Sequence, residues 1–366
     1  MPLGVVVRTG KGGWSPPAAK LTAGDRPAMR VPPAGLRSAP VDLDLLFLGT
    51  AGSAPTASRG TSATLVRRGG DRLLVDCGEG TQRQLLRSDA GLSDLEDVLL
   101  THLHADHVLG LPGMLKTFAL RGRELPIVVY GPRGTRGLLQ ALGVVIGRLS
   151  YELRVVELSA GDTVERDGYR LVPFAVKHAG AALGYAIRER ERPGRFDVAA
   201  AAALGVPDGP ARGALQRGED VTLADGRTVG PAEVLGAARR GRTIVLTGDT
   251  APSATVVEAA SGADVLVHEA TFLAEERTRA RETDHSTAAE AALVAREAGV
   301  ALLALTHVSA RYAGSEVEEE ARHLFPDTVV PRDFDIIEVP LPERGPPELV
   351  PRGGRRGRTQ DVGSGA

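Results

Sequence analysis

The 366-residue chain is long enough for one large domain with extensions, and its 42% hydrophobic content is enough for a substantial core. Its net charge of -2 excludes a uniformly basic nucleic-acid-binding surface, so any contact with a polyanion must come from a local patch. The single cysteine, Cys77, excludes an intrachain disulfide and indicates a reducing compartment, the cytoplasm. No apolar run approaches the roughly 18 residues of a membrane span, and we identify no secretory signal.

Both ends of the chain differ in composition from its middle. Residues 1–40 and 341–366 are rich in proline, glycine and arginine without a sustained hydrophobic period, so we predict disordered extensions there. Residues 41–340 begin with a strand pattern and a hairpin, and then alternate strand patterns with helix patterns. This alternation predicts a single layered α/β domain over residues 41–340.

A cluster of metal-ligand residue types follows the strand predicted at residues 97–101. His102, His104, Asp106 and His107 lie close together in the sequence, and both imidazole and carboxylate groups suit Zn2+. Alternation along an extended segment lets His102 and His104 point the same way. Open α/β folds place their sites at the carboxyl ends of strands. The pattern therefore favours a metal site over histidines that are merely hydrogen-bonded in a loop.

Three more candidate ligands each follow a hydrophobic strand pattern directly: His178, Asp249 and His307. Because parallel strands end at the same edge of a sheet, we expect these side chains to converge on the cluster. Asp76 also ends a strand, and it is interpreted either as a partner that orients a metal-bound histidine or as a helix cap.

Residues 190–242 interrupt this alternating pattern. Turn-rich segments recur through them, and a stretch this long without core periodicity should protrude from the domain. The stretch is either a solvated insertion or an arm that grips a polyanion. Its positive charge is scattered over Arg212, Arg217, Arg239, Arg240 and Arg242.

Taken together, the motifs resemble those of ribonuclease Z, the family of tRNA 3′-processing endonucleases within the metallo-β-lactamase superfamily, in its short form. The histidine-rich cluster occurs throughout the superfamily and says little about the substrate. The other matching segments are Phe47-Leu48-Gly49-Thr50, Asp76-Cys77-Gly78-Glu79-Gly80-Thr81-Gln82, Gly205-Val206-Pro207-Asp208-Gly209-Pro210, Gly248-Asp249-Thr250, His268-Glu269-Ala270-Thr271 and His285-Ser286-Thr287. The resemblance implies a four-layer αββα sandwich with a protruding tRNA-binding arm at residues 190–242.

The resemblance also implies two Zn2+ ions in each subunit. Its ligand set maps onto His102, His104 and His178 for one ion, Asp106, His107 and His307 for the other, and Asp249 as the bridge. In the same way, it implies that Asp106 is the proton acceptor, that His285 faces the scissile phosphate and that Glu269 orients His285. The expected substrate is precursor tRNA, cut to leave a 3′-OH on the tRNA and a 5′-phosphate on the trailer. The family forms homodimers, so we expect a homodimer, and we expect no membrane partner.

One segment departs from the family pattern, and two other functions compete. Residues 55–60 lack the lysine and the final asparagine of the family's Pro-x-Lys-x-Arg-Asn loop, which leaves the cleavage position and the handling of CCA open. A hydrolase of a small phosphodiester, ester or lactone would share every metal ligand, but it would need no remote arm. A non-catalytic RNA-binding module would not need the complete ligand set.

Overall fold

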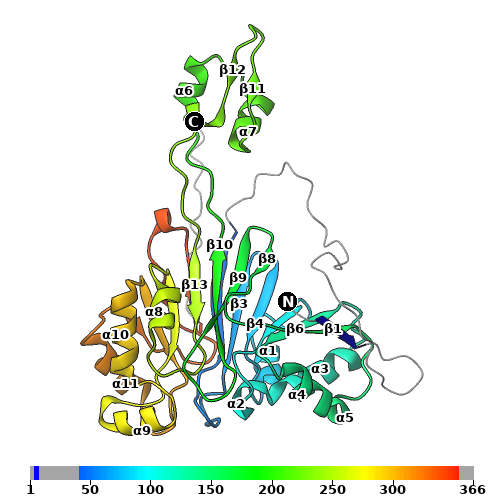
Figure 1. Ribbon diagram of the computed structural model, residues 1–366, viewed down its shortest axis with the longest axis vertical. Coiled ribbons are helices and arrows are strands. Elements are labelled where there is room, and N and C mark those ends of the chain that lie inside the picture. Colours follow the sequence, from blue (N-terminus) through cyan, green and yellow to red (C-terminus); the bar gives the residue numbers. More distant parts are fainter. Residues whose placement is uncertain (1–3, 8–40, 354–366) are drawn as a thin grey trace.

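The computed structural model describes residues 4–7 and 41–353, which form two facing β-sheets with helices on both outer sides (Figure 1). The first sheet has nine strands in the spatial order β1 (Gly4–Val7), β7 (Leu153–Glu157), β6 (Ile127–Gly131), β5 (Asp97–Leu99), β4 (Asp71–Val75), β3 (Ala63–Arg68), β2 (Leu43–Gly49), β17 (Ile336–Glu338) and β18 (Glu348–Val350). The second has seven, in the order β16 (Thr328–Val329), β15 (Leu302–Thr306), β14 (Val265–Glu269), β13 (Thr243–Leu246), β10 (Leu183–Glu189), β9 (Tyr169–Ala175) and β8 (Val164–Arg166).

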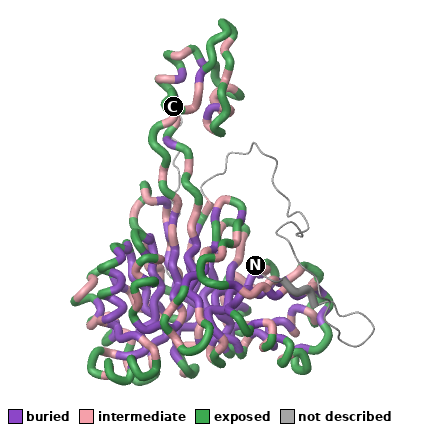
Figure 2. Tube along the Cα trace, in the orientation of Figure 1, coloured by how far each residue is buried: buried purple, intermediate pink, exposed green. Residues whose placement is uncertain are grey.

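Three apolar layers hold the sheets and helices together, and the buried segments in Figure 2 follow them. One layer lies between the two sheets. Another joins the first sheet to α1 (Thr81–Arg87), α2 (Ala105–Val108), α3 (Gly110–Leu120), α4 (Thr135–Ala141) and α5 (Gly143–Ile146). The third joins the second sheet to α8 (Ala254–Ala260), α10 (Ala288–Ala298) and α11 (Gly314–Arg322). The resulting αββα sandwich confirms the predicted fold class.

Helix α10 illustrates how local sequence sets the bounds of an element. It follows η2 (Ala274–Glu276) and α9 (Arg277–Glu282). The Thr287 hydroxyl accepts a hydrogen bond from the Glu290 N–H at 3.2 Å, and the Glu290 carboxylate accepts one from the Thr287 N–H at 3.2 Å. This reciprocal capping satisfies donors that the first helical turn leaves free. The helix ends at Gly299, whose left-handed backbone a glycine adopts without steric cost.

The strands that carry candidate site residues all run toward one edge of the sandwich, which we call the site edge. Strands β4 and β5 are parallel, as are β13, β14 and β15. Strand β9 is antiparallel to β10, which is antiparallel to β13, so β9 also ends at this edge. The Leu183 N–H donates to the Thr101 carbonyl at 2.8 Å and links the two sheets there.

At the opposite edge, β10 and β13 lead into a protruding arm (residues 190–242), which Figure 1 shows extending away from the domain. The two chain segments that enter and leave the arm form a stalk, with β-bridges between Arg192 and Arg239 and between Phe196 and Leu235. The head of the arm contains α6 (Val198–Ala203), α7 (Pro210–Gln216), β11 (Val221–Thr222), β12 (Thr228–Val229) and η1 (Pro231–Glu233). A small core of its own stabilises it, made of Ala201, Val206, Leu215, Val229 and Val234.

The two ends of the chain differ in part from the predicted extensions. Gly4–Val7 forms β1 and pairs with β7. Beyond residue 341, η3 (Pro342–Arg344) and β18 are ordered, because β18 completes its hydrogen bonds on β17 and Leu349 packs against the layer between the sheets. The predicted disorder at residues 1–3, 8–40 and 354–366 lies outside the described residues. Within the described ranges, no helix is long and apolar enough to cross a membrane.

A buried ion pair between Arg242 and Glu189 lies where the stalk meets the sandwich. The side chain of Arg242 is 3% exposed and donates to both oxygens of Glu189, at 2.7 and 2.8 Å. It also donates to the carbonyl oxygens of Val339, at 2.9 Å, and Val41, at 2.6 Å. The pair therefore ties the arm to both ends of the domain.

Replacing Glu189 by alanine would leave the Arg242 charge buried without its acidic partner. We expect the free energy of unfolding to fall by about 3 kcal/mol, because breaking one side of a buried pair leaves an uncompensated charge. The matched control is Glu165→Ala, which removes an exposed pair with Arg190 and should cost less than about 1 kcal/mol. Urea denaturation of both variants measures the difference, and equal losses would contradict this assignment.

Candidate metal centre

Seven predicted ligands come together at the site edge, from both sheets. They form two sets, and within each set one ligand atom per residue lies within 4.8 Å of the others. Asp249, which follows β13, belongs to both sets. The sets are His102, His104, His178 and Asp249, and Asp106, His107, His307 and Asp249.

Asp249 lies between the two sets. Its Oδ1 is 3.3 Å from Nε2 of His107, and its Oδ2 is 3.3 Å from Nε2 of His307. The same Oδ2 is 3.6 Å from Nε2 of His102 and 4.0 Å from Nε2 of His178. A single carboxylate thus faces imidazoles from both sets, and this arrangement could bridge two cations.

Buried polar atoms without a hydrogen-bond partner mark the middle of the cluster. In the part of the chain that the structure describes, they include Nε2 of His102, Nε2 of His107 and Oδ1 of Asp249. Buried polar groups almost always have partners, so three such atoms facing one another need an explanation. Imidazole nitrogen and carboxylate oxygen are donors that Zn2+ accepts, so the residues present fit a metal centre.

The electrostatics of the cluster also favour a cation. Burial and the neighbouring imidazole of His107 lower the pKa of His102 to about 2, so its ring is neutral and keeps a lone pair. Burial opposes protonation of His107, but Asp249 and Asp76 raise its pKa well above the usual range. Burial would raise the pKa of Asp249, but the neighbouring imidazoles of His307 and His107 hold it well below the usual range. Positive charge is therefore stabilised between His107 and Asp249, where a metal ion could replace the proton.

Four of the histidines are held through the ring nitrogen that faces away from Asp249. The partners are Thr101 Oγ1 for His102 at 3.0 Å, Asp76 Oδ2 for His107 at 2.8 Å, the Asp284 carbonyl for His178 at 3.0 Å and Thr271 Oγ1 for His307 at 2.8 Å. Such partners fix the orientation of metal-binding imidazoles. Of the two interpretations of Asp76, the structure supports the first, since Gly80 occupies the N-cap of α1. The roles of Thr101 and the Asp284 carbonyl were not predicted from the sequence.

Backbone strain gathers around the same cluster. Of the five non-glycine residues with positive φ in the described ranges, four border the site: Ser53, Asp76, Asp284 and His307. This conformation is uncommon for residues with a Cβ, and it often accompanies functional sites, where the surrounding structure enforces it. At these positions the group that meets the cluster is the N–H of Ser53, the carboxylate of Asp76, the carbonyl of Asp284 and the imidazole of His307.

Beside the ligands, His285 forms a close pair with Glu269. The His285 Nδ1 lies 2.7 Å from Glu269 Oε1, and Glu269 also accepts from the Thr250 N–H at 2.9 Å and the Thr271 hydroxyl at 2.6 Å. The rings of His285 and His307 stack at 5.4 Å. Although burial opposes it, Glu269 raises the pKa of His285 to about 9. The imidazole is therefore protonated at neutral pH and can donate a proton.

Asp106 is held from the opposite side. Its Oδ2 accepts from the Ser53 N–H at 2.9 Å and lies 3.1 Å from Nε2 of His307. Burial would raise its pKa, but the hydrogen bond to His307 and the charge of His107 hold the pKa below the usual range. Asp106 is therefore ionised at neutral pH and can accept a proton.

The segment that departs from the family pattern is anchored next to Asp106. Arg59 donates to Thr50 Oγ1 at 2.6 Å and to the Pro331 carbonyl at 2.8 Å. Asp333 accepts from the Gly60 N–H at 2.7 Å and from Gln84 Nε2 at 2.7 Å. Asp333 was not predicted to anchor this segment, because the partners that accomplish this, Gly60 and Gln84, are more than 200 residues away in the sequence.

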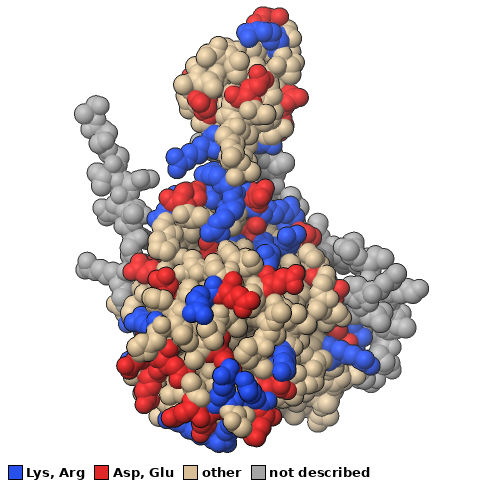
Figure 3. All heavy atoms as spheres, turned by 60° about the vertical axis from the view of Figure 1, so that its left-hand side comes forward, with Lys and Arg blue, Asp and Glu red and all other residues tan. Residues whose placement is uncertain are grey.

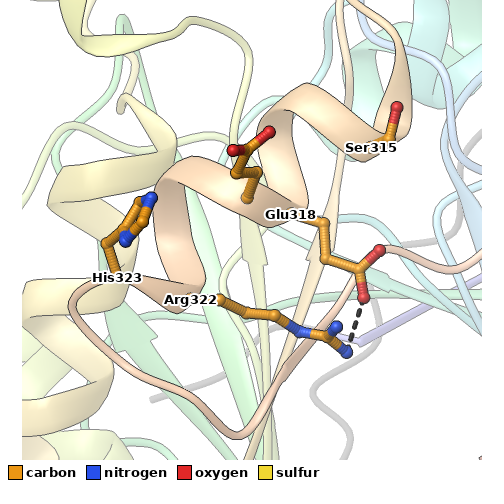
Figure 4. A pocket seen from close by; sticks show the side chains of 5 residues that line it. Ser315, Glu318, Arg322 and His323 are labelled. Atoms are coloured by element: carbon orange, nitrogen blue, oxygen red, sulfur yellow. Dashed lines mark ion pairs between the residues drawn. The ribbon is translucent and has the colours of Figure 1, made fainter.

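A separate hollow on α11 has no such chemistry. It has a volume of about 330 Å3 and is lined by Ser315, Glu318, Glu319, Arg322 and His323 (Figure 4). Arg322 is used in an ion pair with Glu318 at 2.6 Å, and His323 belongs to none of the ligand groups. We therefore assign the chemistry to the site edge.

The five arm arginines that give the sequence its scattered positive charge are ion-paired in the structure. Arg212 pairs with Asp208, Arg217 with Glu219, Arg239 with Glu343, Arg240 with Asp264, and Arg242 with Glu189. In the head, residues 197–237, six acidic residues outnumber three arginines. Figure 3 shows basic side chains gathered where the stalk meets the domain, and acidic ones spread over the head. Pairing was not visible in the sequence because several partners lie far along the chain.

Comparison with known proteins gives the class first. Residues 71–239 match the family described as "Beta-lactamase superfamily domain". The fold resembles that of a metallo-β-lactamase fold protein from Bacillus subtilis, with a TM-score of 0.60 and 19% identity over 81% of this chain and 99% of the other. These likenesses agree with the αββα sandwich.

More similar relatives define the family. The chain is 49% identical to a ribonuclease Z of Gemmatimonas aurantiaca, over 81% of this chain and 96% of the relative. It is 45% identical to a ribonuclease Z of Methanosarcina acetivorans, over 81% of this chain and 98% of the relative. The structure of the short form of human tRNase Z has a TM-score of 0.59 at 25% identity, over 81% and 99% of the two chains. The chain belongs to the ribonuclease Z family.

Replacing Glu269 by glutamine should lower the pKa of His285 from about 9 toward the ordinary value near 6.5, because the opposing burial remains. A raised pKa stabilises the folded state below about pH 6.5, and this contribution is lost as the pH rises through about 9. NMR titration of the His285 ring in the metal-free protein measures the shift. The control, Glu258→Gln on the exposed face of α8, should leave it unchanged. A pKa near 9 in the Glu269 variant would contradict the pairing.

Proposed function

We propose that this protein is a zinc-dependent endoribonuclease that removes the 3′ trailer from precursor tRNA. The observation that most strongly supports this proposal is that the Glu269–His285 pair lies beside the two ligand sets around Asp249. The 45–49% identity to ribonuclease Z proteins over nearly their whole length supports the substrate. The free thiol of Cys77 is buried, in keeping with a reducing compartment, and we propose that the protein acts in the cytoplasm.

Two Zn2+ ions per subunit fit the donor set. His102, His104 and His178 would hold one ion, Asp106, His107 and His307 the other, and Asp249 would contact both. When bound, two such ions supply Lewis acidity toward the phosphate and make water a stronger nucleophile at neutral pH.

The protein's own groups handle the protons. Asp106, ionised and fixed by the Ser53 N–H, accepts a proton from the attacking water. His285, held through Nδ1 by Glu269, donates its Nε2 proton to the leaving 3′ oxygen of the tRNA. The bond between phosphorus and that oxygen breaks, so the tRNA keeps a 3′-OH and the trailer keeps a 5′-phosphate.

The function is tested by cleavage of a precursor tRNA that carries a 3′ trailer, with the product ends mapped. We expect a single cut near the discriminator base that leaves a 3′-OH, and His285→Ala should lower kcat by about 100-fold or more through loss of the proton donor. His323→Ala, which changes the exposed histidine on α11, is the matched control and should retain full activity. Hydrolysis of a small phosphodiester without any cut in the precursor tRNA would overturn the substrate assignment.

Metal stoichiometry tests the ligand assignment separately. We expect two Zn2+ per wild-type subunit, about one in His104→Ala and close to none in Asp249→Ala, because Asp249 belongs to both ligand sets. Plasma mass spectrometry after dialysis measures the content. Asp94→Asn, an exposed carboxylate on the loop before β5, is the control. Two Zn2+ ions in the Asp249 variant would contradict the assignment of Asp249 to both ligand sets.

We also propose a homodimer in which the arm of one subunit serves the site of the other. In support, the arm leaves the sandwich at the edge opposite its own ligands. Large apolar side chains are exposed along α2, α3 and α5 and the loop after α3: Leu109, Leu120, Leu125, Val144 and Val145, with Val144 93% exposed. Contiguous exposed apolar side chains often mark a protein interface.

Mixing two inactive variants tests action in trans. One lacks residues 197–237 of the arm, and the other is the full-length His285→Ala. In mixed dimers, the arm of the second can serve the intact site of the first, so we expect precursor cleavage to return. Activity of either variant alone on a small phosphodiester reports folding of its site. An unrestored mixture that sedimentation shows to be heterodimeric would contradict the proposal.

A further inference from the structure

Four exposed arginine side chains lie near the site edge without an acidic partner. They are Arg83 and Arg87 on α1, Arg332 before β17 and Arg352 after β18. Across residues 4–7 and 41–353, no carboxylate forms an ion pair with any of the four. We call them the arginine surface. They contrast with the arm arginines singled out in the sequence, each of which has a carboxylate partner.

The topology of the first sheet places this surface on the same edge as the metal ligands. Strands β2 and β4 are both antiparallel to β3, so both end at the site edge, and α1 begins just after β4. Strand β17 is antiparallel to β2 and therefore begins at that edge, directly after Arg332. Strand β18 is antiparallel to β17 and ends there, directly before Arg352.

Side-chain contacts join two of the four, and the positions of the other two in the chain place them beside this pair. Arg87 and Arg352 both stack on the ring of Phe334, with guanidinium carbons 5.1 and 4.4 Å from its centroid. Arg83 and Arg87 are four residues apart on α1, so they share a helix face. Arg332 is two residues from Phe334.

The two nearby carboxylates, Asp333 and Asp335, already accept hydrogen bonds from other backbone and side-chain donors. Asp335 accepts from the Arg332 N–H at 2.8 Å and from the Arg352 N–H at 2.9 Å. Asp333 is 9% exposed and accepts from Thr50, Gly60 and Gln84. Arg87 Nη1 donates to Gln84 Oε1 at 3.1 Å, and within the described ranges the guanidinium groups of Arg83, Arg332 and Arg352 keep their donors for an external anion.

A short series of hydrogen bonds links the arginine surface to the proposed site. Asp333, next to Arg332, binds Gly60 and Thr50, which bracket the loop that carries Ser53. The Ser53 N–H donates to Asp106, the proposed proton acceptor. Only this loop therefore separates Asp106 from Asp333, the neighbour of Arg332 in the arginine surface.

We propose that the arginine surface binds the phosphodiester backbone of the RNA beside the scissile bond. The planar guanidinium group suits bidentate phosphate contacts. The inference rests on the proposed function, since it takes precursor tRNA as the ligand. The backbone bound can belong to the trailer or to the body of the tRNA, and both present the same chemistry.

The test uses the full-length double variant Arg83→Ala/Arg332→Ala, which leaves the stacked pair on Phe334 intact. The matched control is Arg296→Ala, an exposed arginine near the end of α10 at the opposite edge. For each protein, kcat and KM for precursor tRNA are measured over a range of salt, together with hydrolysis of bis(p-nitrophenyl) phosphate. Substrates with a single-nucleotide trailer and with a long trailer are compared.

For the double variant, we expect KM to rise several-fold with kcat unchanged, and the slope of log KM against log salt to become shallower by about 2, one per lost phosphate contact. Hydrolysis of the small diester should be unaffected. A larger effect with the long trailer assigns the surface to the trailer, and an equal effect with both assigns it to the tRNA body.

A KM and a salt slope equal to those of Arg296→Ala would overturn the proposal. The proposal would also be overturned if the double variant lost as much activity on the small diester as on precursor tRNA. If wild type hydrolyses the small diester but never cuts precursor tRNA, the proposed function itself fails.

Discussion

The structure depends on one buried carboxylate that meets histidines from both sheets. Asp249 is 3% exposed and lies within 4.0 Å of nitrogen atoms of His102, His107, His178 and His307. Without a counterion, so many buried polar groups would weaken the edge of the sandwich. Their mutual attraction holds the donors together at this edge, and their residue types are those that bind Zn2+, which is why we propose the metal centre here. The positive φ values of Asp76, Asp284 and His307 show how far the backbone adapts to it.

The sequence was most informative where chemistry coincided with strand ends. His178, Asp249 and His307 are far apart in the chain, but each follows a strand pattern, so their convergence could be predicted from the geometry of parallel sheets. The groups that hold the histidines were less visible. Thr101 and the Asp284 carbonyl act through backbone conformation and contacts between sheets, which hydrophobic patterns do not encode.

Charge was the least predictable property. Arg217 and Glu219 are neighbours in the sequence, but Arg239 pairs with Glu343, 104 residues away. The arginines of the arm indicated scattered positive charge in the sequence, whereas in the structure those five are ion-paired, and arginines without an acidic partner lie near the site edge. Up to residue 353, the predicted disorder after residue 341 was wrong for a similar reason, because β18 is stabilised by pairing with β17 rather than by its own composition.

The most direct test of the central claim is a crystal structure of the zinc-loaded protein with anomalous data collected at the zinc edge. The account predicts two anomalous peaks in each subunit on either side of Asp249, one beside His102, His104 and His178 and the other beside Asp106, His107 and His307. A single peak, or peaks that make no contact with Asp249, would contradict the claim that this carboxylate joins the two sheets into one catalytic centre.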